Sequence, residues 1–143
     1  MTLAGLLSSC SNEHGDSPLS RRTVIRNQPI ATWVYGKYVD ENSPLDYYVK
    51  FRNIGPDIVS FDYTIADRAD VPHLDRNGPN SGLVPNLYPG VEVAVPNTLK
   101  RSNVIVSVGK VIHGKKTLEQ LQAVYPSDAT SRLADAAPEP SRN

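Results

Sequence analysis

The sequence has one cysteine, no long apolar run and no excess of charge of either sign. A single cysteine, Cys10, cannot form an internal disulfide. No stretch approaches the ~18–20 consecutive apolar residues that span a bilayer. The 15 Lys and Arg residues balance 15 Asp and Glu residues, which argues against a nucleic-acid-binding protein, because such proteins carry a basic excess. The 143 residues fit one small domain with tails.

The sequence also lacks the common catalytic signatures. It contains no Gly-x-Ser-x-Gly elbow, no His-Glu-x-x-His pair and no glycine-rich phosphate loop. Its three histidines, His14, His73 and His113, are far apart in the chain. Nucleophilic catalysis requires a base beside an activated nucleophile, and no local pattern supplies one. We therefore expect a protein that is not an enzyme, with a small hydrolase of unrecognised active site as the third hypothesis for its function.

The first ten residues are apolar and end in small residues before Cys10, which is the order of a secretory h-region and its cleavage site. Leu7-Ser8-Ser9-Cys10 resembles a bacterial lipobox. The resemblance implies that Cys10 is diacylated, and that the protein is a membrane-anchored lipoprotein of the cell envelope. Ser11 stands where an Asp signals inner-membrane retention in that family, so the resemblance implies outer-membrane sorting in a Gram-negative cell.

Nine residues precede Cys10, and none of them is Lys or Arg. A signal peptide normally has ~15–30 residues with a positive start, so residues 1–10 are interpreted as the remnant of one, with a start codon further upstream. Residues 11–22 are polar and show no apolar periodicity. We interpret them as a tether, followed by a folded domain over residues 23–126.

Short runs of β-type residues follow, separated by turn residues. Residues 30–39 are rich in aromatic and β-branched residues, and residues 91–95 and 104–112 alternate valine with other residues. Residues 23–26 form a shorter run of the same type. Residues 46–66 contain two alternating runs around Asn53-Ile54-Gly55-Pro56-Asp57, which predicts a hairpin.

Two turn motifs carry a second resemblance. Phe51-Arg52-Asn53-x-Gly55 leads into an alternating strand, and Leu87-Tyr88-Pro89-Gly90 precedes a later one. This arrangement resembles the immunoglobulin-like or fibronectin-type domains of bacterial envelope proteins, over roughly residues 30–112. We therefore predict an all-β fold, an antiparallel immunoglobulin-like β-sandwich of five to seven strands. Fold resemblance alone does not identify a function.

One short C-terminal helix is predicted near the end of the domain. Thr117 and Gln120 have the spacing of a capping box, Leu118, Leu121 and Tyr125 fall at helical spacing, and Pro126 follows. Residues 127–143 are rich in Ala, Ser, Pro and charge. Their composition predicts a disordered tail.

The connection between the predicted strands at residues 59–66 and 91–95 is long and rich in oxygen donors. Long connections are often functional. The donors lie two or three residues apart: Asp67, Asp70, His73, Asp75 and Asn77. Such donors can surround calcium, which takes six to eight oxygen ligands, although solvated loop residues explain the same pattern. No other cofactor is expected, and zinc is disfavoured because only one histidine and no cysteine lie here.

The aromatic residues crowd the first three long runs. We expect one inner face of Trp33, Tyr35, Tyr47, Phe51, Phe61 and Tyr63. Tyr38 and Tyr48 would then lie outside, where tyrosine suits contact with a partner.

Charge is uneven along the chain. Residues 40–92 contain nine acidic and four basic residues, whereas residues 93–118 contain five basic and no acidic ones. Opposite charges on paired strands account for this pattern. The alternative is a basic edge that faces an anionic surface, formed by Lys100, Arg101, Lys115 and Lys116.

The leading hypothesis is a non-catalytic, lipid-anchored envelope protein that acts as a binding or assembly module. Its partner would be an envelope protein or an anionic surface, and not a nucleic acid. The second hypothesis is a periplasmic or extracellular domain that binds a metal or ligand through residues 67–86.

Overall fold

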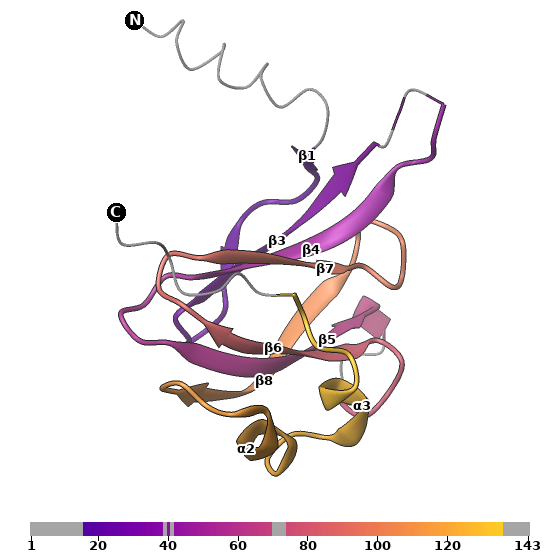
Figure 1. Cartoon of the computed structure of the whole chain (residues 1–143). Helices are drawn as coiled ribbons and strands as arrows, with labels where there is room; N and C mark the ends of the chain where they lie inside the picture. Colours follow the sequence, from indigo (N-terminus) through magenta and orange to yellow (C-terminus); the bar gives the residue numbers. More distant parts are fainter. Residues whose placement is uncertain (1–15, 39, 41, 70–73, 136–143) are drawn as a thin grey trace, which may run out of the picture.

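The computed structural model describes residues 16–38, 40, 42–69 and 74–135, and they form two antiparallel sheets packed face to face (Figure 1). Sheet A contains β1 (Asp16–Pro18), β2 (Thr23–Val24), β3 (Ile30–Lys37), β4 (Asp46–Asn53) and β7 (Glu92–Pro96). Sheet B has the order β6 (Ser81–Leu87), β5 (Val59–Ala66) and β8 (Ile105–His113). The predicted all-β sandwich is confirmed. The two sheets contain five and three strands, one more in total than the predicted maximum of seven, because β1 and β6 were not predicted.

The core lies between the two sheets and is centred on aromatic side chains. Phe51 on β4 and Phe61 on β5 are both 0% exposed, and their ring centroids lie 5.1 Å apart in an edge-to-face arrangement. The Tyr63 ring lies 5.2 Å from that of Phe51. Aliphatic residues from both sheets complete the core, among them Val93 and Val95 of β7, so the valine alternation seen in residues 91–95 marks the core face there.

The predicted hairpin of residues 46–66 is wrong. β4 pairs with β3 and β7, whereas β5 pairs with β6 and β8, so residues 54–58 carry the chain from one sheet to the other. The reason is burial, because all eight residues of β5 are buried. In β4 only alternate residues are buried, so β5 lies in a sheet covered on both faces, whereas the sheet of β4 has one face partly exposed.

β6 lies within the segment that was predicted to be a long loop. Gly82 and Pro85 interrupt its apolar pattern, and both disfavour a strand interior. The structure accommodates Pro85 through a change of register, from Phe61↔Val84 to Val59↔Leu87. The adjacent Asn86 takes a positive φ of 46°. A bulge of this kind cannot be predicted from composition.

The folded part of the chain extends beyond residues 23–126 at both ends. β1 pairs with β3 inside the predicted tether. At the other end α2 (Leu118–Gln122) is followed by α3 (Ser127–Thr130) in the predicted disordered tail. Leu83 donates its N–H to the carbonyl of Arg132 at 3.1 Å and accepts from the N–H of Ala134 at 2.8 Å. These backbone bonds order a segment that has few apolar residues, so the prediction of disorder from residue 127 is wrong for residues 127–135.

The predicted helix and its cap are confirmed. The Thr117 hydroxyl accepts from the N–H of Gln120 at 3.1 Å, and the Thr117 N–H donates to the Gln120 side chain at 2.8 Å. Leu121 and Tyr125 pack on Leu83 and Ile112, which face away from the core. The helices therefore cover the outer face of sheet B (Figure 1).

Candidate functional site

Of the predicted calcium site, Asp67 and Asp75 line one cavity of about 210 Å³. Asp70 and His73 lie outside the described residues. The Asp67 carboxylate pairs with the Arg101 guanidinium. The Asp75 carboxylate accepts from the N–H of Asn77 at 3.0 Å, and the Asn77 side chain accepts from the N–H of Asp128 at 2.7 Å, at the start of α3. Among the described residues no group of three His, Cys, Asp or Glu side chains gathers.

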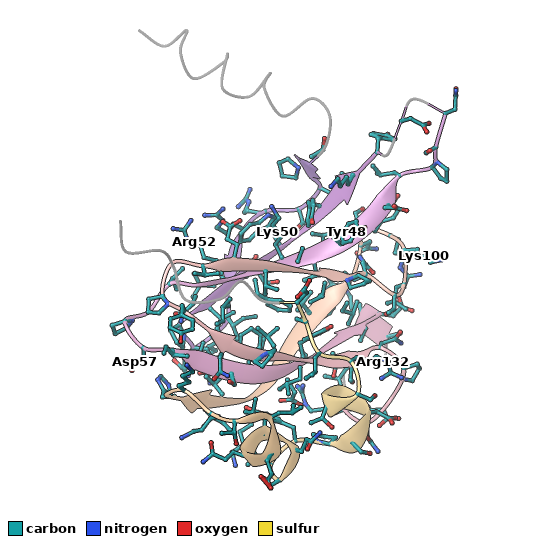
Figure 2. All side chains as sticks on the ribbon, in the orientation of Figure 1. Tyr48, Lys50, Arg52, Asp57, Lys100 and Arg132 are labelled. Carbon is teal, nitrogen blue, oxygen red and sulfur yellow. The ribbon has the colours of Figure 1, made fainter. Side chains whose placement is uncertain are left out.

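The predicted basic edge is not one cluster. Lys100 and Arg101 precede β8, and Lys115 and Lys116 follow it. The nine residues of β8 span ~27 Å at the usual rise of a strand. Figure 2 agrees, because Lys100 lies at the opposite side of the sandwich from Asp57, whose carboxylate is hydrogen-bonded to His113, the last residue of β8. The two basic pairs therefore flank the edge strand β8 at its opposite ends.

Trp33 and Tyr35 lie on the outer face of sheet A, which corrects the predicted inner face. Trp33 pairs with Lys50, and Tyr35 pairs with Tyr48. Residues paired in register share a face of the sheet, and Phe51 faces the core. Both faces of β3 are apolar, so alternation alone could not distinguish them. Of the two tyrosines predicted outside, Tyr38 is 49% exposed, and Tyr48 stacks on Tyr35 with centroids 5.3 Å apart.

A second set of side chains assembles around these rings, and we call the whole group the aromatic–basic face. Its members come from β3, β4, β7 and the segment before β2: Arg22, Trp33, Tyr35, Tyr48, Lys50, Arg52 and Glu92. Figure 2 shows Tyr48, Lys50 and Arg52 in a row along β4. They are alternate residues of one strand, so they all point to the same side.

Two cations of this face lie over aromatic rings. The guanidinium carbon of Arg22 is 4.1 Å from the centroid of the Trp33 ring. The Lys50 ammonium is 4.6 Å from the centroid of the Tyr35 ring. Both distances are within the ~6 Å range of a cation–π contact. These contacts hold positive charge at fixed positions on the surface.

Glu92 lies among three cations of the same face. Its carboxylate is 3.8 Å from Arg22, 3.7 Å from Lys50 and 3.5 Å from Arg52. These side chains are partly exposed, from 21% for Lys50 to 55% for Arg22, so each ion pair contributes little to stability. Three cations and one carboxylate leave these four residues with a net charge of +2. These ion pairs among the described side chains of the face thus involve more cations than carboxylates.

The surface is hollowed at this point. A cavity of about 370 Å³ is lined by Pro18 and Ser20 and by five residues of the face: Arg22, Trp33, Tyr35, Lys50 and Glu92. That volume falls within the ~300–1,000 Å³ of ligand sites. Sequence reasoning missed Arg22 because it lies in the predicted tether. It also missed Glu92 on β7. The predicted hairpin paired β4 with β5, so the pairing of β4 with β7 that places Glu92 opposite Arg52 was not foreseen.

A buried ion pair secures the long connection to sheet B. The Asp62 carboxylate, 4% exposed, accepts from the N–H of Lys110 at 2.9 Å, and the Arg76 guanidinium lies 3.9 Å from it. Arg76 also donates to the Ser107 hydroxyl. A Cβ at Gly109 would lie 2.4 Å from Asp62, so the glycine leaves room for this pair. These contacts give Asp62 and Arg76 a structural role.

His113 and Asp57 are a pair of residue types found in hydrolases. The His113 Nδ1 lies 3.1 Å from the Asp57 carboxylate, and the two side chains are 53% and 58% exposed. In the part of the chain that the structure describes, no hydroxyl or thiol is hydrogen-bonded to this imidazole. Catalysis by a nucleophile needs such a contact, and the geometry here is that of a hydrogen bond between two exposed side chains.

Comparisons with family models, with curated proteins and with solved structures found no match to this chain. Within the described ranges, no helix is both long and apolar enough to cross a membrane.

Proposed function

We propose that this protein is a non-catalytic binding module of the cell envelope, anchored to a membrane through Cys10, and that it binds an acidic polymer through the aromatic–basic face. Cys10 lies outside the described residues, so the anchor rests on the lipobox resemblance. The observation that supports the binding site is the net charge of +2 on Arg22, Lys50, Arg52 and Glu92, set beside the aromatic rings of β3 and β4.

The chemistry of the face suits a polysaccharide that carries carboxylate groups. Arg22 and Arg52 present planar guanidinium groups, which bind carboxylates with two parallel hydrogen bonds. Trp33 and Tyr48 supply apolar surfaces of the size of a sugar ring. Lys50 is held between Tyr35 and Glu92, so its charge is already in place before the ligand arrives.

The test is a titration of the purified chain with polygalacturonate, an acidic polysaccharide, and with dextran, a neutral one. The double variant Lys50→Gln, Arg52→Gln should weaken polygalacturonate binding about tenfold or more at low salt. The matched control Lys115→Gln, Lys116→Gln removes two charges beyond the other end of the sandwich and should change it little. Raising the salt should weaken binding by the parent chain, because exposed charges are screened over ~10 Å at 0.1 M.

Equal losses in the two double variants would mean that net charge alone attracts the polymer, and would contradict the assignment of the site. Dextran binding as tight as polygalacturonate binding would contradict the role of charge.

A further inference from the structure

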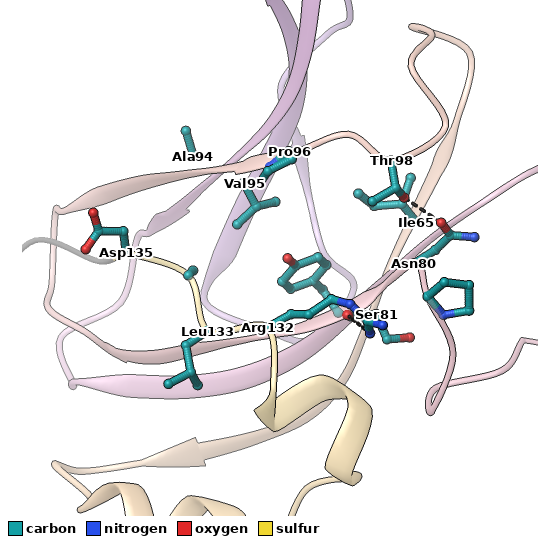
Figure 3. Close-up of a pocket in the computed structure, with 13 residues that line it drawn as sticks. Ile65, Asn80, Ser81, Ala94, Val95, Pro96, Thr98, Arg132, Leu133 and Asp135 are labelled. Carbon is teal, nitrogen blue, oxygen red and sulfur yellow. Dashed lines mark hydrogen bonds between the residues drawn. The ribbon is translucent and has the colours of Figure 1, made fainter.

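A second cavity opens between the edges of the two sheets. It has a volume of about 330 Å³ and lies beside β7 of sheet A and the start of β6 of sheet B. Figure 3 shows Leu133 and Asp135 of the C-terminal segment on one side, and Val95 and Pro96 of β7 across from them. The walls are mainly apolar, with Ile65, Val95 and Leu133 among the lining residues.

A tyrosine hydroxyl reaches this cavity without a protein partner. Tyr63 lines the cavity and is 6% exposed. Its ring lies across Gly82 so closely that a Cβ there would be 2.3 Å from the hydroxyl oxygen. No described residue hydrogen-bonds to that hydroxyl. Among the described residues the buried side-chain polar atoms without a partner do not include this hydroxyl, so it opens into the cavity and is available to donate to a ligand.

A fixed positive charge lies beside the hydroxyl. One nitrogen of the Arg132 guanidinium, Nη1, donates to the carbonyls of Gly78 at 2.8 Å, Ser81 at 3.2 Å and Asp128 at 3.2 Å. Within the described chain, no carboxylate forms an ion pair with Arg132. The neutral carbonyls hold the guanidinium in place without cancelling its charge. Asp135 lines the cavity at the end away from Arg132 (Figure 3).

We propose that this cavity binds a small carboxylic acid with an apolar body. The carboxylate would accept a hydrogen bond from the Tyr63 hydroxyl and pair with the Arg132 guanidinium, and the apolar body would lie against Ile65, Val95 and Leu133. Hydrogen bonds to a charged group are stronger than neutral ones, and the apolar walls exclude water from the rest of the ligand. This site is separate from the aromatic–basic face and shares none of its residues.

Burial raises the pKa of Tyr63 to about 12, and the nearby Arg132 opposes this shift. The hydroxyl is therefore protonated at neutral pH and available as a donor. Ionisation of Tyr63 would remove the hydrogen-bond donor and place a negatively charged phenolate beside the carboxylate of the ligand. Binding should consequently persist through mildly alkaline pH.

The probe is octanoate, with 1-octanol as the ligand of equal chain length that lacks the acid. Calorimetry on the full chain should show saturable octanoate binding, weakened about tenfold by Tyr63→Phe and by Arg132→Gln. Octanol should bind more weakly than octanoate, and Arg132→Gln should not change its affinity. The matched controls Tyr38→Phe and Arg26→Gln change the same residue types elsewhere on the chain and should leave octanoate binding intact.

A stability measurement separates a ligand-binding role of Tyr63 from a structural one. Tyr63→Phe keeps the ring over Gly82 and removes only the unpartnered hydroxyl, so the unliganded variant should unfold at the same temperature as the parent or a higher one. A lower unfolding temperature would assign the hydroxyl to the fold and overturn the proposal. Absence of saturable octanoate binding, or equal binding by the Tyr63→Phe variant, would also overturn it. Loss of polygalacturonate binding in the Lys50 and Arg52 variant bears only on the other site.

Discussion

The side chain of Asn53 at the end of β4 donates a hydrogen bond to the carbonyl of Leu87 at the end of β6, at 2.8 Å, and so ties the two sheets together. The same amide donates to the carbonyl of Asp57 at 2.6 Å and accepts from the N–H of Gly55 at 2.9 Å. Asn53 is 0% exposed. This one residue therefore holds the crossing segment in the shape that separates β4 from β5.

Asn53→Ala should destabilise the protein by at least about 2 kcal/mol, because it leaves buried backbone groups without partners. Chemical denaturation measures this loss. Asn103, which is exposed, provides the matched control, and Asn103→Ala should change stability by less than about 0.5 kcal/mol. Similar values for the two variants would show that the crossing segment does not depend on Asn53.

Phe61→Ala tests the position of the core. The residue is 0% exposed and contacts the Phe51 ring, so its truncation should cost about 3–5 kcal/mol in the free energy of unfolding. Denaturant titration of the two proteins gives the difference. A loss below about 1 kcal/mol, far under that range, would place Phe61 outside the core.

The edge of sheet B at β8 can be tested with proline. Ile65 donates its N–H to Asn80 at 3.0 Å, toward β6. Because successive residues of a strand direct their backbone N–H and C=O groups to opposite sides, those of Thr64 point toward β8, where Thr64 pairs with Ser107. The N–H of Ser107 therefore points toward β5, and the N–H of Val108 points away from it. Proline removes one N–H donor. It should therefore break a ladder bond at residue 107 and none at residue 108.

For this comparison, each proline variant is measured against alanine at the same position, so that the loss of the side chain cancels. The extra cost of proline should be about 3 kcal/mol at residue 107 and clearly smaller at residue 108, where the N–H faces outward. Equal extra costs would mean that both faces of the β8 backbone are bonded.

The sequence predicted the parts of this molecule that depend on local pattern. Valine alternation identified β7 and β8, and Thr117 with Gln120 identified the start of α2, because these signals lie within a few neighbouring residues. The partners of β4 and β5 were mispredicted, since an antiparallel hairpin and a crossing between sheets begin with the same turn residues. The side-chain bonds of Asn53 distinguish the two, and they depend on Leu87, which is 34 residues further along the chain.

The candidate site was predicted only in part for the same reason. Tyr48 was expected on the surface, and it lies on the aromatic–basic face. Arg22 and Glu92 belong to distant segments of the chain, and the pairing of Arg52 with Glu92 in register brings one of them to the site. Charge counted along the sequence pointed instead to lysines that the nine residues of β8 keep apart.

Stability should fall as the pH rises above about 10. Burial raises the pKa of Tyr63 from 10.0 to about 12 and also raises that of Tyr125. Between pH 10.0 and about 12 the unfolded chain loses phenolic protons that the folded chain retains. The unfolded state then binds fewer protons, so raising the pH lowers the free energy of unfolding. The fall should be less steep in Tyr63→Phe. Unfolding curves at pH 8 and pH 11 measure it, and an identical fall in parent and variant would contradict the high pKa of Tyr63.

The most direct test of the aromatic–basic face is a nitrogen-15 NMR titration of the chain with polygalacturonate. Trp33 is the single tryptophan of the sequence, so its indole N–H gives one resolved signal from the middle of the face. We predict that this signal and the backbone amides of Lys50 and Arg52 shift progressively and saturate together. Saturable shifts confined to the residues around Lys115 and Lys116, with the Trp33 indole unchanged, would contradict the account.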